Sequence, residues 1–481
     1  MQILRARKGD NMSKVVLSKK DKYFRDFALN GNLWKVVLSV GLPLAFYQTL
    51  SLVFRLIDTM MASHISAESV SAVAYLSQLN NMISAIGGGL AVGSSLEISK
   101  AYGAGNYEMV KKRVSSLISI CALLGVALLC MVPFSEVILR FANTPKDLIE
   151  VGSKYFSIEL VGIVITFFNN VYLAIERARG NTKRILYLNF GIIIVKLSLT
   201  AIFVYILKSG IQMIAIANVI SQSIILITAI INLNKKDNAF GFSFGSIEFK
   251  KPVIGPMLKL SFPVVIEKMA FSLGKVIVNS MSGNYGGLAV GALNISNNIG
   301  GITTGPQNGF QEGGAAIISQ NLGAGQVKRA LETFKRTLVV NVTIGIVGMI
   351  TTLMFLKPLT FIFANSSGGF DAEFQNMIIS MYRFEAFGGC IPLAFNASVI
   401  SLLLGFGYTK ITLIINFLRV FVYRIPVLFL LQRFTDLGAI SCGLVMLISN
   451  TLVSITSVII AFFVIRHICK KENVTFKNAI S

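Results

Sequence analysis

Residues 35–63 read KVVLSVGLPLAFYQTLSLVFRLIDTMMAS, an apolar run long enough to cross a bilayer as a helix. Pro43 kinks this run, and Arg55 and Asp58 stand near its far end. At about 1.5 Å per residue, Asp58 lies roughly 22 Å beyond Pro43, within or at the outer edge of the hydrocarbon layer. A carboxylate at that depth is costly unless it is paired, protonated or hydrated, so it marks a functional site by default. The alternative is that Asp58 pairs with Arg55 one turn back and only caps the span.

The composition is that of a polytopic membrane protein. Of 481 residues, 54% are hydrophobic and 14% are charged, and the mean hydropathy is +0.70, whereas a soluble chain carries about a quarter charged residues. Residues 1–34 are polar and basic, without the apolar segment and cleavage site of a secretory leader. The net charge of +22 does not indicate a nucleic-acid partner, because most Lys and Arg lie in short segments between apolar runs.

Nothing in the sequence indicates an enzyme, a cofactor or a metal site. The five cysteines are scattered without a CxxC pair, so we expect reduced thiols and no disulfide framework. The two histidines are too far apart in the sequence to suggest a metal cluster. No Ser-His-Asp set and no phosphate loop with a lysine is present.

Apolar runs of about 18 or more residues predict about twelve membrane-spanning helices. The connections that follow even-numbered spans are rich in Lys and Arg, whereas those that follow odd-numbered spans are poor in both. By the positive-inside rule, both termini are cytoplasmic, and we expect a multi-pass protein of the cell membrane. The predicted spans are 35–60, 69–98, 114–138, 152–177, 185–207, 211–233, 257–281, 288–318, 335–363, 375–404, 410–431 and 437–466.

The two halves of the chain repeat each other. ISKAYGAGNYEMVKKR at 98–113 matches ISQNLGAGQVKRALETFKR at 318–336, and Pro43 matches Pro263 at the same offset of 220 residues. We therefore predict an all-α membrane protein with two homologous six-helix lobes in parallel orientation. The predicted divisions are a cytoplasmic N-terminal tail 1–34, an N-lobe 35–233, a cytoplasmic linker 234–256, a C-lobe 257–466 and a cytoplasmic tail 467–481.

A Gly-Ala-Gly sequence follows the second predicted span at 103–105 and the eighth at 323–325. Such a sequence could hold a phosphate at a helix N-terminus, but the strand of a nucleotide-binding unit and the Walker lysine are absent. A tight turn at a helix C-terminus, with glycine at positive φ, is the better explanation. Any transport would then be powered by an ion gradient or by the gradient of the substrate itself.

These motifs, in this order and repeated twice, resemble the multidrug and toxic compound extrusion (MATE) family over nearly the whole chain. The residues that carry the resemblance are Pro43 with Asp58, GAGN at 103–106, Gly180-Asn181-Thr182, and GAGQ at 323–326 followed by Arg329-Ala330. The resemblance implies a twelve-helix secondary antiporter whose two lobes enclose a central cavity. It also implies export of small organic compounds against inward flow of H⁺ or Na⁺, with Asp58 taking part in cation binding.

The fifth span departs from the family pattern. Where members with an N-lobe cation site tend to carry Asn-x-x-x-Asp, this chain has Lys196 at the Asn position and Thr200 at the Asp position. Lys196 could act as a tethered cation beside Asp58, or it could titrate, because burial lowers a lysine pKa and a carboxylate partner raises it. Either alternative makes ordinary Na⁺ coupling less suitable than H⁺ coupling. Arg55 is a second candidate partner of Asp58.

Further candidate site residues lie within or beside the spans. Glu267, one turn past Pro263, is a candidate for ion coupling. Asparagines inside a helix bundle line a cavity or join helices by hydrogen bonds. The candidate substrate-binding residues are Asn169, Asn170, Asn218, Asn279 (the repeat counterpart of Asp58), Lys275 and Asn396 (the counterpart of the pair 169–170).

Taken together, the residues predict a monomeric MATE-like antiporter that exports small organic or amphiphilic compounds by alternating access of its two lobes. Buried bases are at least as numerous as buried acids, so we expect an anionic or zwitterionic cargo. One alternative is a lipid or lipid-linked oligosaccharide flippase of the same superfamily, because a basic cavity fits a pyrophosphate head group. Another is a protein of transporter shape that does not transport and acts as a sensor or scaffold.

Overall fold

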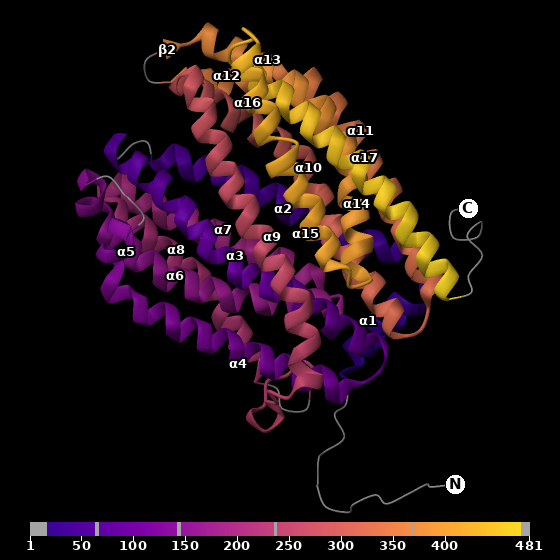
Figure 1. Cartoon of the computed structure of the whole chain (residues 1–481). Helices are drawn as coiled ribbons and strands as arrows, with labels where there is room; N and C mark the ends of the chain where they lie inside the picture. Colours follow the sequence, from indigo (N-terminus) through magenta and orange to yellow (C-terminus); the bar gives the residue numbers. More distant parts are fainter. Residues whose placement is uncertain (1–16, 63–66, 142–145, 235–237, 367–368, 473–481) are drawn as a thin grey trace, which may run out of the picture.

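The computed structural model describes residues 17–62, 67–141, 146–234, 238–366 and 369–472, with side chains left out of the description mainly at 53–75. The described chain is almost entirely helical (Figure 1). The short α1, Lys19–Asn30, precedes twelve long helical stretches, some of them broken. These are α2 Leu33–Ala62, α3 Ala67–Gly103, α4 Tyr107–Met131 with α5 Ser135–Phe141, α6 Lys146–Arg179, α7 Thr182–Ala201, α8 Ile211–Leu233, α9 Lys251–Ser282, α10 Gly287–Gly323, α11 Val327–Met354 with α12 Leu356–Ala364, α13 Ala372–Gly389 with α14 Ile391–Gly405, α15 Thr409–Phe417 with α16 Ile425–Phe434, and α17 Ile440–Lys471.

Shorter elements join or end these helices. A two-residue antiparallel pair, β1 with β2, lies between α12 and α13. Two π-helical turns, η2 and η5, extend α7 and α15. The bounds are η1 Val132–Phe134, η2 Ile202–Ile206, η3 Phe244–Ser246, η4 Gly283–Tyr285, η5 Leu418–Val422, β1 Asn365–Ser366 and β2 Gly369–Phe370.

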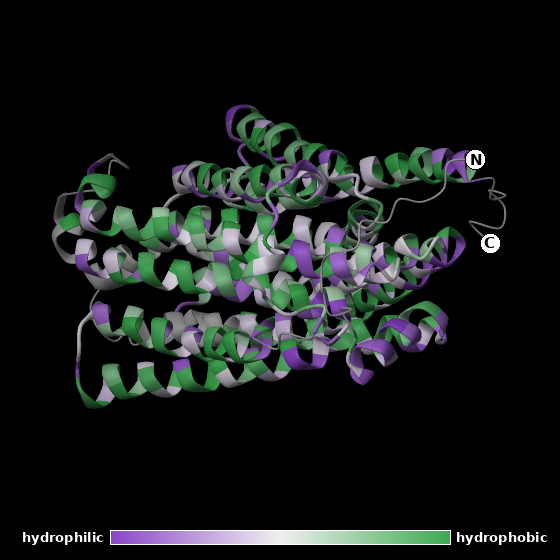
Figure 2. Cartoon of the chain, turned by 90° about the horizontal axis from the view of Figure 1, so that it is seen from below, coloured by the Kyte–Doolittle hydropathy of each residue, from purple (hydrophilic) through white to green (hydrophobic). Residues whose placement is uncertain are grey.

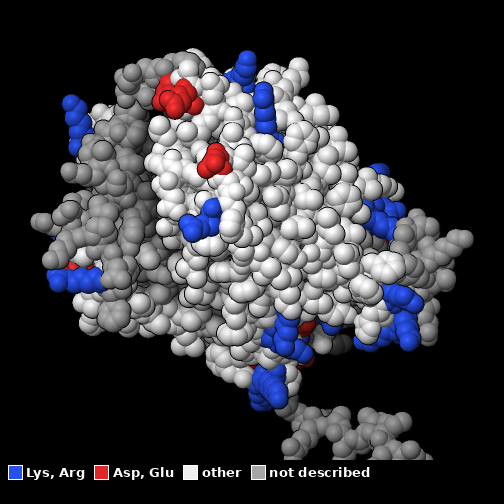
Figure 3. Space-filling model, turned by 45° about the horizontal axis from the view of Figure 1, so that its top comes forward, with Lys and Arg blue, Asp and Glu red and all other residues white. Residues whose placement is uncertain are grey.

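The prediction of an all-α membrane protein is confirmed. Within the described residues, nine helices are long and apolar enough to cross a membrane, or ten if α13 and α14, bent by 42° at their junction, form one span. The other two predicted spans are α9 and α10, which are long but carry many polar residues. Figure 2 shows apolar residues along the helices and hydrophilic ones toward the end where the chain termini lie. Charged side chains are sparse over the middle of the described surface in Figure 3.

Two lobes make up the molecule, an N-lobe of α2–α8 and a C-lobe of α9–α17. They meet crosswise, because α3 of the N-lobe packs along α9 and α2 packs along α10. Figure 1 shows the lobes close together where α1, η3 and the end of α17 lie, and diverging toward α5 and β2. We call the former end, marked by α1, residues 238–250 and the end of α17, the linker end.

Glycines let the lobes approach backbone to backbone. A Cβ added at Gly89 would lie 2.6 Å from the Cα of Val265, and one added at Gly309 would lie 2.5 Å from the backbone nitrogen of Ala45. Both pairs are related by the repeat offset of 220, since 89 + 220 is 309 and 45 + 220 is 265. The interface between the lobes therefore follows the pseudo-twofold symmetry of the repeat, and no larger side chain fits at either glycine without displacing the partner backbone.

The two Gly-Ala-Gly sequences form the tight turns predicted for them. Gly105 and Gly325 both have φ near +75°, the left-handed conformation that glycine adopts freely. Each turn packs against the other lobe: a Cβ at Gly103 would lie 1.9 Å from the carbonyl oxygen of Gln320, and one at Gly323 would lie 1.9 Å from that of Lys100. These sequences thus join the lobes at the linker end, and the contact is again symmetric under the repeat.

Two segments predicted to be a tail and a linker are structured. Within the predicted tail, Lys19–Asn30 forms α1, whose Asp21 is 2% exposed and accepts two hydrogen bonds from Arg179 at 2.9 and 3.0 Å. The predicted linker packs against α4, where the Ser116 hydroxyl accepts from the Glu248 amide at 3.0 Å and donates to its carbonyl at 3.1 Å. Hydrophobic periodicity could not predict that either segment is structured, because both are polar and are stabilised by contacts with residues distant in sequence.

We expect Gly323→Ala to weaken the contact between the lobes. The new Cβ would collide with the Lys100 carbonyl, and overpacking of this kind costs about 1–3 kcal/mol. The measurement is the thermal unfolding midpoint of the purified protein. Gly191→Ala in α7 is the control, because nothing lies within 4 Å of its added Cβ and a helical Gly→Ala change gains about 0.5–1 kcal/mol. Equal midpoints for the two variants would contradict the tight contact.

Candidate functional site

The N-lobe residues predicted for ion coupling lie on α2 and α7. The backbone of α2 runs past both Arg55 and Asp58, but their side chains lie outside the described residues, so the structure gives no distance from Asp58 to Lys196. On α7, Lys196 is half-buried, and Thr200, one turn later, is fully buried. The hydroxyl of Thr200 has no hydrogen-bond partner among the described groups.

A second acid of the N-lobe, Glu159 on α6, was not among the predicted site residues. It is 8% exposed and accepts hydrogen bonds from Asn80 of α3 at 3.3 Å and from Asn218 of α8 at 3.4 Å. The predicted site residue Asn218 therefore contributes to a polar cluster that joins three helices. The available signal was a lone acid within an apolar run, which by itself does not identify its partners.

The two predicted residues on α6, Asn169 and Asn170, have different surroundings. Asn169 packs inside the N-lobe, whereas Asn170 lies near the C-lobe. Asn169 is 2% exposed and donates to both the backbone and side-chain oxygens of Gln222 at 2.9 Å, so it joins α6 to α8. The side-chain nitrogens of Asn170 and Lys268 both lie about 4 Å from a Cβ placed on Gly88 of α3. Lys268 of the C-lobe thus reaches the face of the N-lobe beside Asn170.

In the C-lobe, Glu267 joins α9 to α15. Its two carboxylate oxygens accept hydrogen bonds from the Thr412 hydroxyl at 2.8 Å and from the Asn416 amide at 2.9 Å. Neither partner is charged. Asn416 is the repeat counterpart of Asn189, whose amide instead donates to a carbonyl of its own helix at 2.7 Å. Both lobes therefore hold a carboxylate with neutral donors, Glu267 in the C-lobe and Glu159 in the N-lobe, but Asn189 itself holds none.

A group of cations, which we call the basic cluster, consists of Lys275, Arg419 and Arg424. Arg419 donates to the side-chain oxygen of Asn450 through Nε at 3.1 Å and Nη2 at 2.9 Å, and Arg424 donates to the same oxygen at 2.8 Å. Lys275 and Arg419 both lie over the ring of Phe271, at 5.1 and 5.6 Å from its centre. Two guanidinium groups thus share one neutral oxygen in the interior of the lobe.

One carboxylate faces the basic cluster. Glu385 of α13 is 7% exposed and accepts a short hydrogen bond from the Ser296 hydroxyl of α10. The charges of Arg424, Arg419 and Lys275 all act on it. With three cations and one carboxylate, this group of described residues carries a formal charge of +2. Arg424 is buried and Arg419 is half-buried, so their charges interact in a medium of low dielectric constant, where an anion would be stabilised, whereas Lys275 is exposed and its charge is screened more.

The π-helical turn η5 explains why Arg419 and Arg424 meet. On a regular α-helix, two residues five positions apart point about 140° away from each other. In η5 the backbone amide of Tyr423 bonds to the carbonyl of Leu418 at 2.9 Å, an i→i+5 hydrogen bond that brings residues five apart onto one face. Arg419 and Arg424 were not among the predicted site residues, and α-helical periodicity would not have brought them together.

Two further predicted residues have different surroundings. Asn279 lies one turn beyond Lys275 on α9 and is half-buried. Asn396 is 6% exposed and accepts a hydrogen bond from Ser457 of α17 at 2.7 Å, so it joins α14 to α17 inside the C-lobe. Asn396 thus serves helix packing, which is one of the two roles weighed for intramembrane asparagines.

Polar contacts close the linker end. Arg177 of α6 forms an ion pair with Glu312 of α10 at 2.8 Å, and Gln320 of α10 donates to the carbonyl of Ala178 at 2.7 Å. Arg329 of α11 donates to the carbonyl oxygens of Ala28 and Gly31, between α1 and α2. The contacts of Arg177 and Gln320 join the two lobes directly, and that of Arg329 joins the C-lobe to the segment that precedes α2, so the first two must break if the lobes are to separate at this end.

Comparison with known proteins agrees with this architecture. The sequence profile of the MatE family matches residues 43–205 and 263–430, so that each match begins at a repeat proline, Pro43 or Pro263. The chain is 24% identical over 416 residues to the probable multidrug resistance protein YoeA of Bacillus subtilis, covering 84% of this chain and 88% of that protein. It is 22% identical over 432 residues to the probable multidrug resistance protein NorM of Thermotoga maritima, covering 86% and 89%.

Solved structures show the same fold. The structure titled "Crystal structure of MATE in complex with MaL6" superimposes with a TM-score of 0.87 at 19% sequence identity, covering 95% of this chain and all of that one. The two-lobed arrangement described above is therefore the arrangement of that protein.

We expect the stability of the protein to depend on the group that residue 450 places beside Arg419 and Arg424. Asn450→Ala removes the oxygen shared by Arg419 and Arg424 and should lower the free energy of unfolding by about 1–3 kcal/mol. Asn450→Asp supplies a carboxylate to both and should be at least as stable as the unchanged protein. The measurement is the thermal unfolding midpoint, with and without sulfate.

The control for this experiment is Asn341→Ala, since Asn341 is fully buried and donates only to Ser398, at 3.0 Å. Sulfate should stabilise Asn450→Ala more than Asn341→Ala and should give Asn450→Asp no extra stabilisation. An equal effect of sulfate on all three variants would argue against a site that attracts anions.

Proposed function

The chain belongs to the MatE family, whose members are transporters and not enzymes, and from this premise we propose that it is a H⁺-coupled antiporter. In this proposal the protein exports small organic or amphiphilic compounds across the cell membrane by alternating access of its two lobes. The observation that carries the proposal is the bonding of Glu267 to Thr412 and Asn416 within the C-lobe.

Glu267 is suited to exchange protons because its partners are neutral. When the carboxylate is ionised, the two donors stabilise it by charge-assisted hydrogen bonds, which are stronger than those of a neutral acid. When it takes up a proton, the charge disappears and the bonds from α9 to α15 weaken. Two states of α9 relative to α15 then differ in proton content, and a proton gradient can drive the change between them.

The donor set favours H⁺ over Na⁺. A sodium ion is held by oxygen lone pairs, whereas Thr412 and Asn416 direct a hydroxyl and an amide N–H toward Glu267. A proton needs no further ligands, so the residues present are sufficient for it.

In the N-lobe we assign coupling to Asp58, with Lys196, Arg55 and Thr200 as the groups that set its charge. Support for this assignment comes from the sequence, in which Lys196 and Thr200 stand where the family tends to carry an asparagine and an aspartate. Lys196 and Thr200 lie one turn apart on α7. In this scheme, protonation of Asp58 releases its basic partner.

We further propose that the cargo is anionic or zwitterionic. The basic cluster is the support: it places three cations around one carboxylate, and Lys275 and Asn279 follow each other on the same face of α9. Asn170, which lies beside Lys268, would contact the cargo from the N-lobe. The same cluster also suits the phosphate groups of a lipid-linked cargo, which makes a flippase the second candidate function.

We place the linker end in the cytoplasm, because the basic connections lie there. The contacts of Arg177, Gln320 and Arg329 close that end, so this conformation would open to the outside. Alternating access would require the ion pair of Arg177 with Glu312 to break and the glycine contacts to part.

Proteoliposomes with an imposed pH gradient test the coupling. Glu267→Gln keeps one acceptor oxygen for Asn416 and places an amide that donates to the Thr412 hydroxyl, but it cannot change its charge, so we expect it to abolish the part of transport that depends on the pH gradient. Glu136→Gln is the control, because Glu136 is exposed and pairs only with Arg140 on its own helix. Transport that ignores both the pH gradient and Glu267→Gln, but follows a Na⁺ gradient, would refute the proposal.

A comparison of cargoes tests the charge preference. The same vesicles should export an anionic amphiphile faster than a cationic dye, and Lys275→Gln should slow export of the anion about tenfold, equivalent to ~1.4 kcal/mol. Lys357→Gln, an exposed lysine on α12, is the control. Robust cation export unaffected by Lys275→Gln and Lys196→Ala would exclude an anionic cargo, and movement of a lipid-linked pyrophosphate between leaflets would select the flippase.

A further inference from the structure

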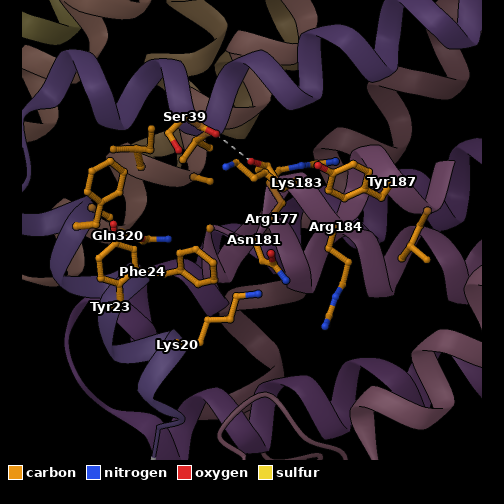
Figure 4. A pocket seen from close by; sticks show the side chains of 18 of the residues that line it. Lys20, Tyr23, Phe24, Ser39, Arg177, Asn181, Lys183, Arg184, Tyr187 and Gln320 are labelled. Atoms are coloured by element: carbon orange, nitrogen blue, oxygen red, sulfur yellow. Dashed lines mark hydrogen bonds between the residues drawn. The ribbon is translucent and has the colours of Figure 1, made fainter. Parts of the chain in front are cut away.

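A pocket of about 670 Å³ lies at the linker end, away from the residues assigned above to coupling and cargo. It is enclosed by α1 on one side and by the ends of α2, α6, α7, α8 and α10 on the other. Figure 4 shows Lys20 and Phe24 of α1 around the same space as Arg177, Asn181 and Gln320. The volume is in the range of sites that hold small organic molecules, about 300–1,000 Å³.

The pocket has an excess of positive charge. Four cationic side chains line it, and no carboxylate does so among the described residues. Two of the four are paired with acids nearby, since Arg177 holds Glu312 at 2.8 Å and Arg184 lies 3.4 Å from Glu176, which Arg179 also holds at 2.8 Å. The excess charge therefore comes from Lys20 and Lys183. The four cations are Lys20, Arg177, Lys183 and Arg184.

Polar groups that line the pocket lack partners. Gln320 is 2% exposed and its Oε1 has no hydrogen-bond partner among the described groups, and the same holds for the buried Nε of Arg177. Buried polar groups are rarely left unsatisfied, so such atoms point to a ligand or to water. Both atoms are buried beneath the pocket surface, so a ligand would reach them when the side chains of Gln320 and Arg177 turn toward the pocket.

The start of α7 adds to the attraction for anions. Residues 180–184 line the pocket, and Asn181, at the N-cap, does not cap the helix because its amide donates to Glu176 at 2.7 Å. The first-turn N–H groups of this 20-residue helix are therefore without a side-chain cap. The positive end of a helix dipole favours negative charge at such a position.

The apolar part of the lining indicates an amphiphile. Phe24 and Phe27 of α1 and Tyr187 of α7 border the pocket, and Tyr187 is 71% exposed on a helix long and apolar enough to span the membrane. Beside it, α1 exposes Tyr23 by 64% and carries lysines at 19, 20 and 22. Aromatic and basic side chains in this combination are typical of a segment at the surface of a membrane that contains anionic lipids.

We propose that this pocket binds the phosphate head group of an anionic glycerophospholipid, with Lys20, Arg177, Lys183 and the start of α7 around the phosphate. The glycerol hydroxyls face Gln320, and the acyl chains leave past Tyr187 into the bilayer. Because α10 of the C-lobe lines the pocket together with α6 and α7 of the N-lobe, the bound lipid holds both lobes at the linker end. A ligand that binds only this closed arrangement stabilises it by mass action.

The repeat supplies a matched control for the test. Lys183 in GNTK corresponds to Lys410 in GYTK, at the start of α15. Lys410 is exposed but does not line the pocket, and the C-lobe has no described counterpart of α1 over it. Lys20 and Lys183 are also exposed, so replacing them with glutamine leaves the packing of the lobes unchanged.

The full-length protein in an uncharged detergent is titrated with phosphatidylglycerol, phosphatidylcholine or inorganic phosphate. Bound lipid is counted by native mass spectrometry, and the thermal unfolding midpoint is recorded in parallel. We expect phosphatidylglycerol to bind and to raise the midpoint more than phosphatidylcholine does. The double variant Lys20→Gln with Lys183→Gln should bind phosphatidylglycerol at least fivefold more weakly, whereas Lys410→Gln should bind it as the unchanged protein does.

Three results would overturn the proposal. Equal binding of phosphatidylglycerol and phosphatidylcholine would show that the charge of the head group does not affect binding. Unchanged phosphatidylglycerol binding in the double variant would place the lipid elsewhere. A full shift of the midpoint with inorganic phosphate alone would replace the lipid with a soluble phosphate. None of these measurements depends on transport, so they stand whatever the coupling ion or cargo proves to be.

Discussion

The contact of backbone with backbone between the lobes is the constraint on which the architecture depends. Glycines at 89 and 103 in the N-lobe and at 309 and 323 in the C-lobe allow it, and each stands where a Cβ would strike the other lobe. Because the four positions form two pairs under the repeat, the interface is symmetric although the lobes differ in most of their residues. Small residues that let helices approach closely are the usual means of association in membranes, where burial from water supplies no driving force.

The ionisable side chains of the two lobes do not follow this symmetry. Neutral donors hold a carboxylate in each lobe, Glu267 in the C-lobe and Glu159 in the N-lobe, but among the described side chains the basic cluster with Glu385 belongs to the C-lobe. Ionisable groups in a medium of low dielectric constant remain charged only where the surroundings compensate them. The lobes therefore share a fold but not an electrostatic environment, which is what a transporter needs if one lobe is to respond to an ion or cargo differently from the other.

Much of the fold could be predicted from the sequence, because a span requires about twenty apolar residues and the repeat at offset 220 is visible by inspection. The Gly-Ala-Gly turns followed from the conformational freedom of glycine. What could not be predicted depends on contacts between distant residues. The helix α1 is polar and is held by Arg179, far along the chain, and Arg419 meets Arg424 only because η5 departs from α-helical periodicity. Glu267 was recognised from its place after Pro263, but its partners on α15 were not.

The short segment 261–268 of α9 links the chemistry of the C-lobe to the interface. Ser261 and Val265 pack against glycines of α3, and Lys268 reaches Gly88 of the same helix. Glu267 lies among these residues and bonds in another direction, to α15. Two turns of one helix thus carry both the carboxylate proposed for proton exchange and the contact that holds the lobes together. In the proposed mechanism, a change in the charge of Glu267 would alter the position of α9 against α15, and α9 would then also move against α3. The distance between coupling site and interface is therefore a single helix width, and no longer path through the lobe is required.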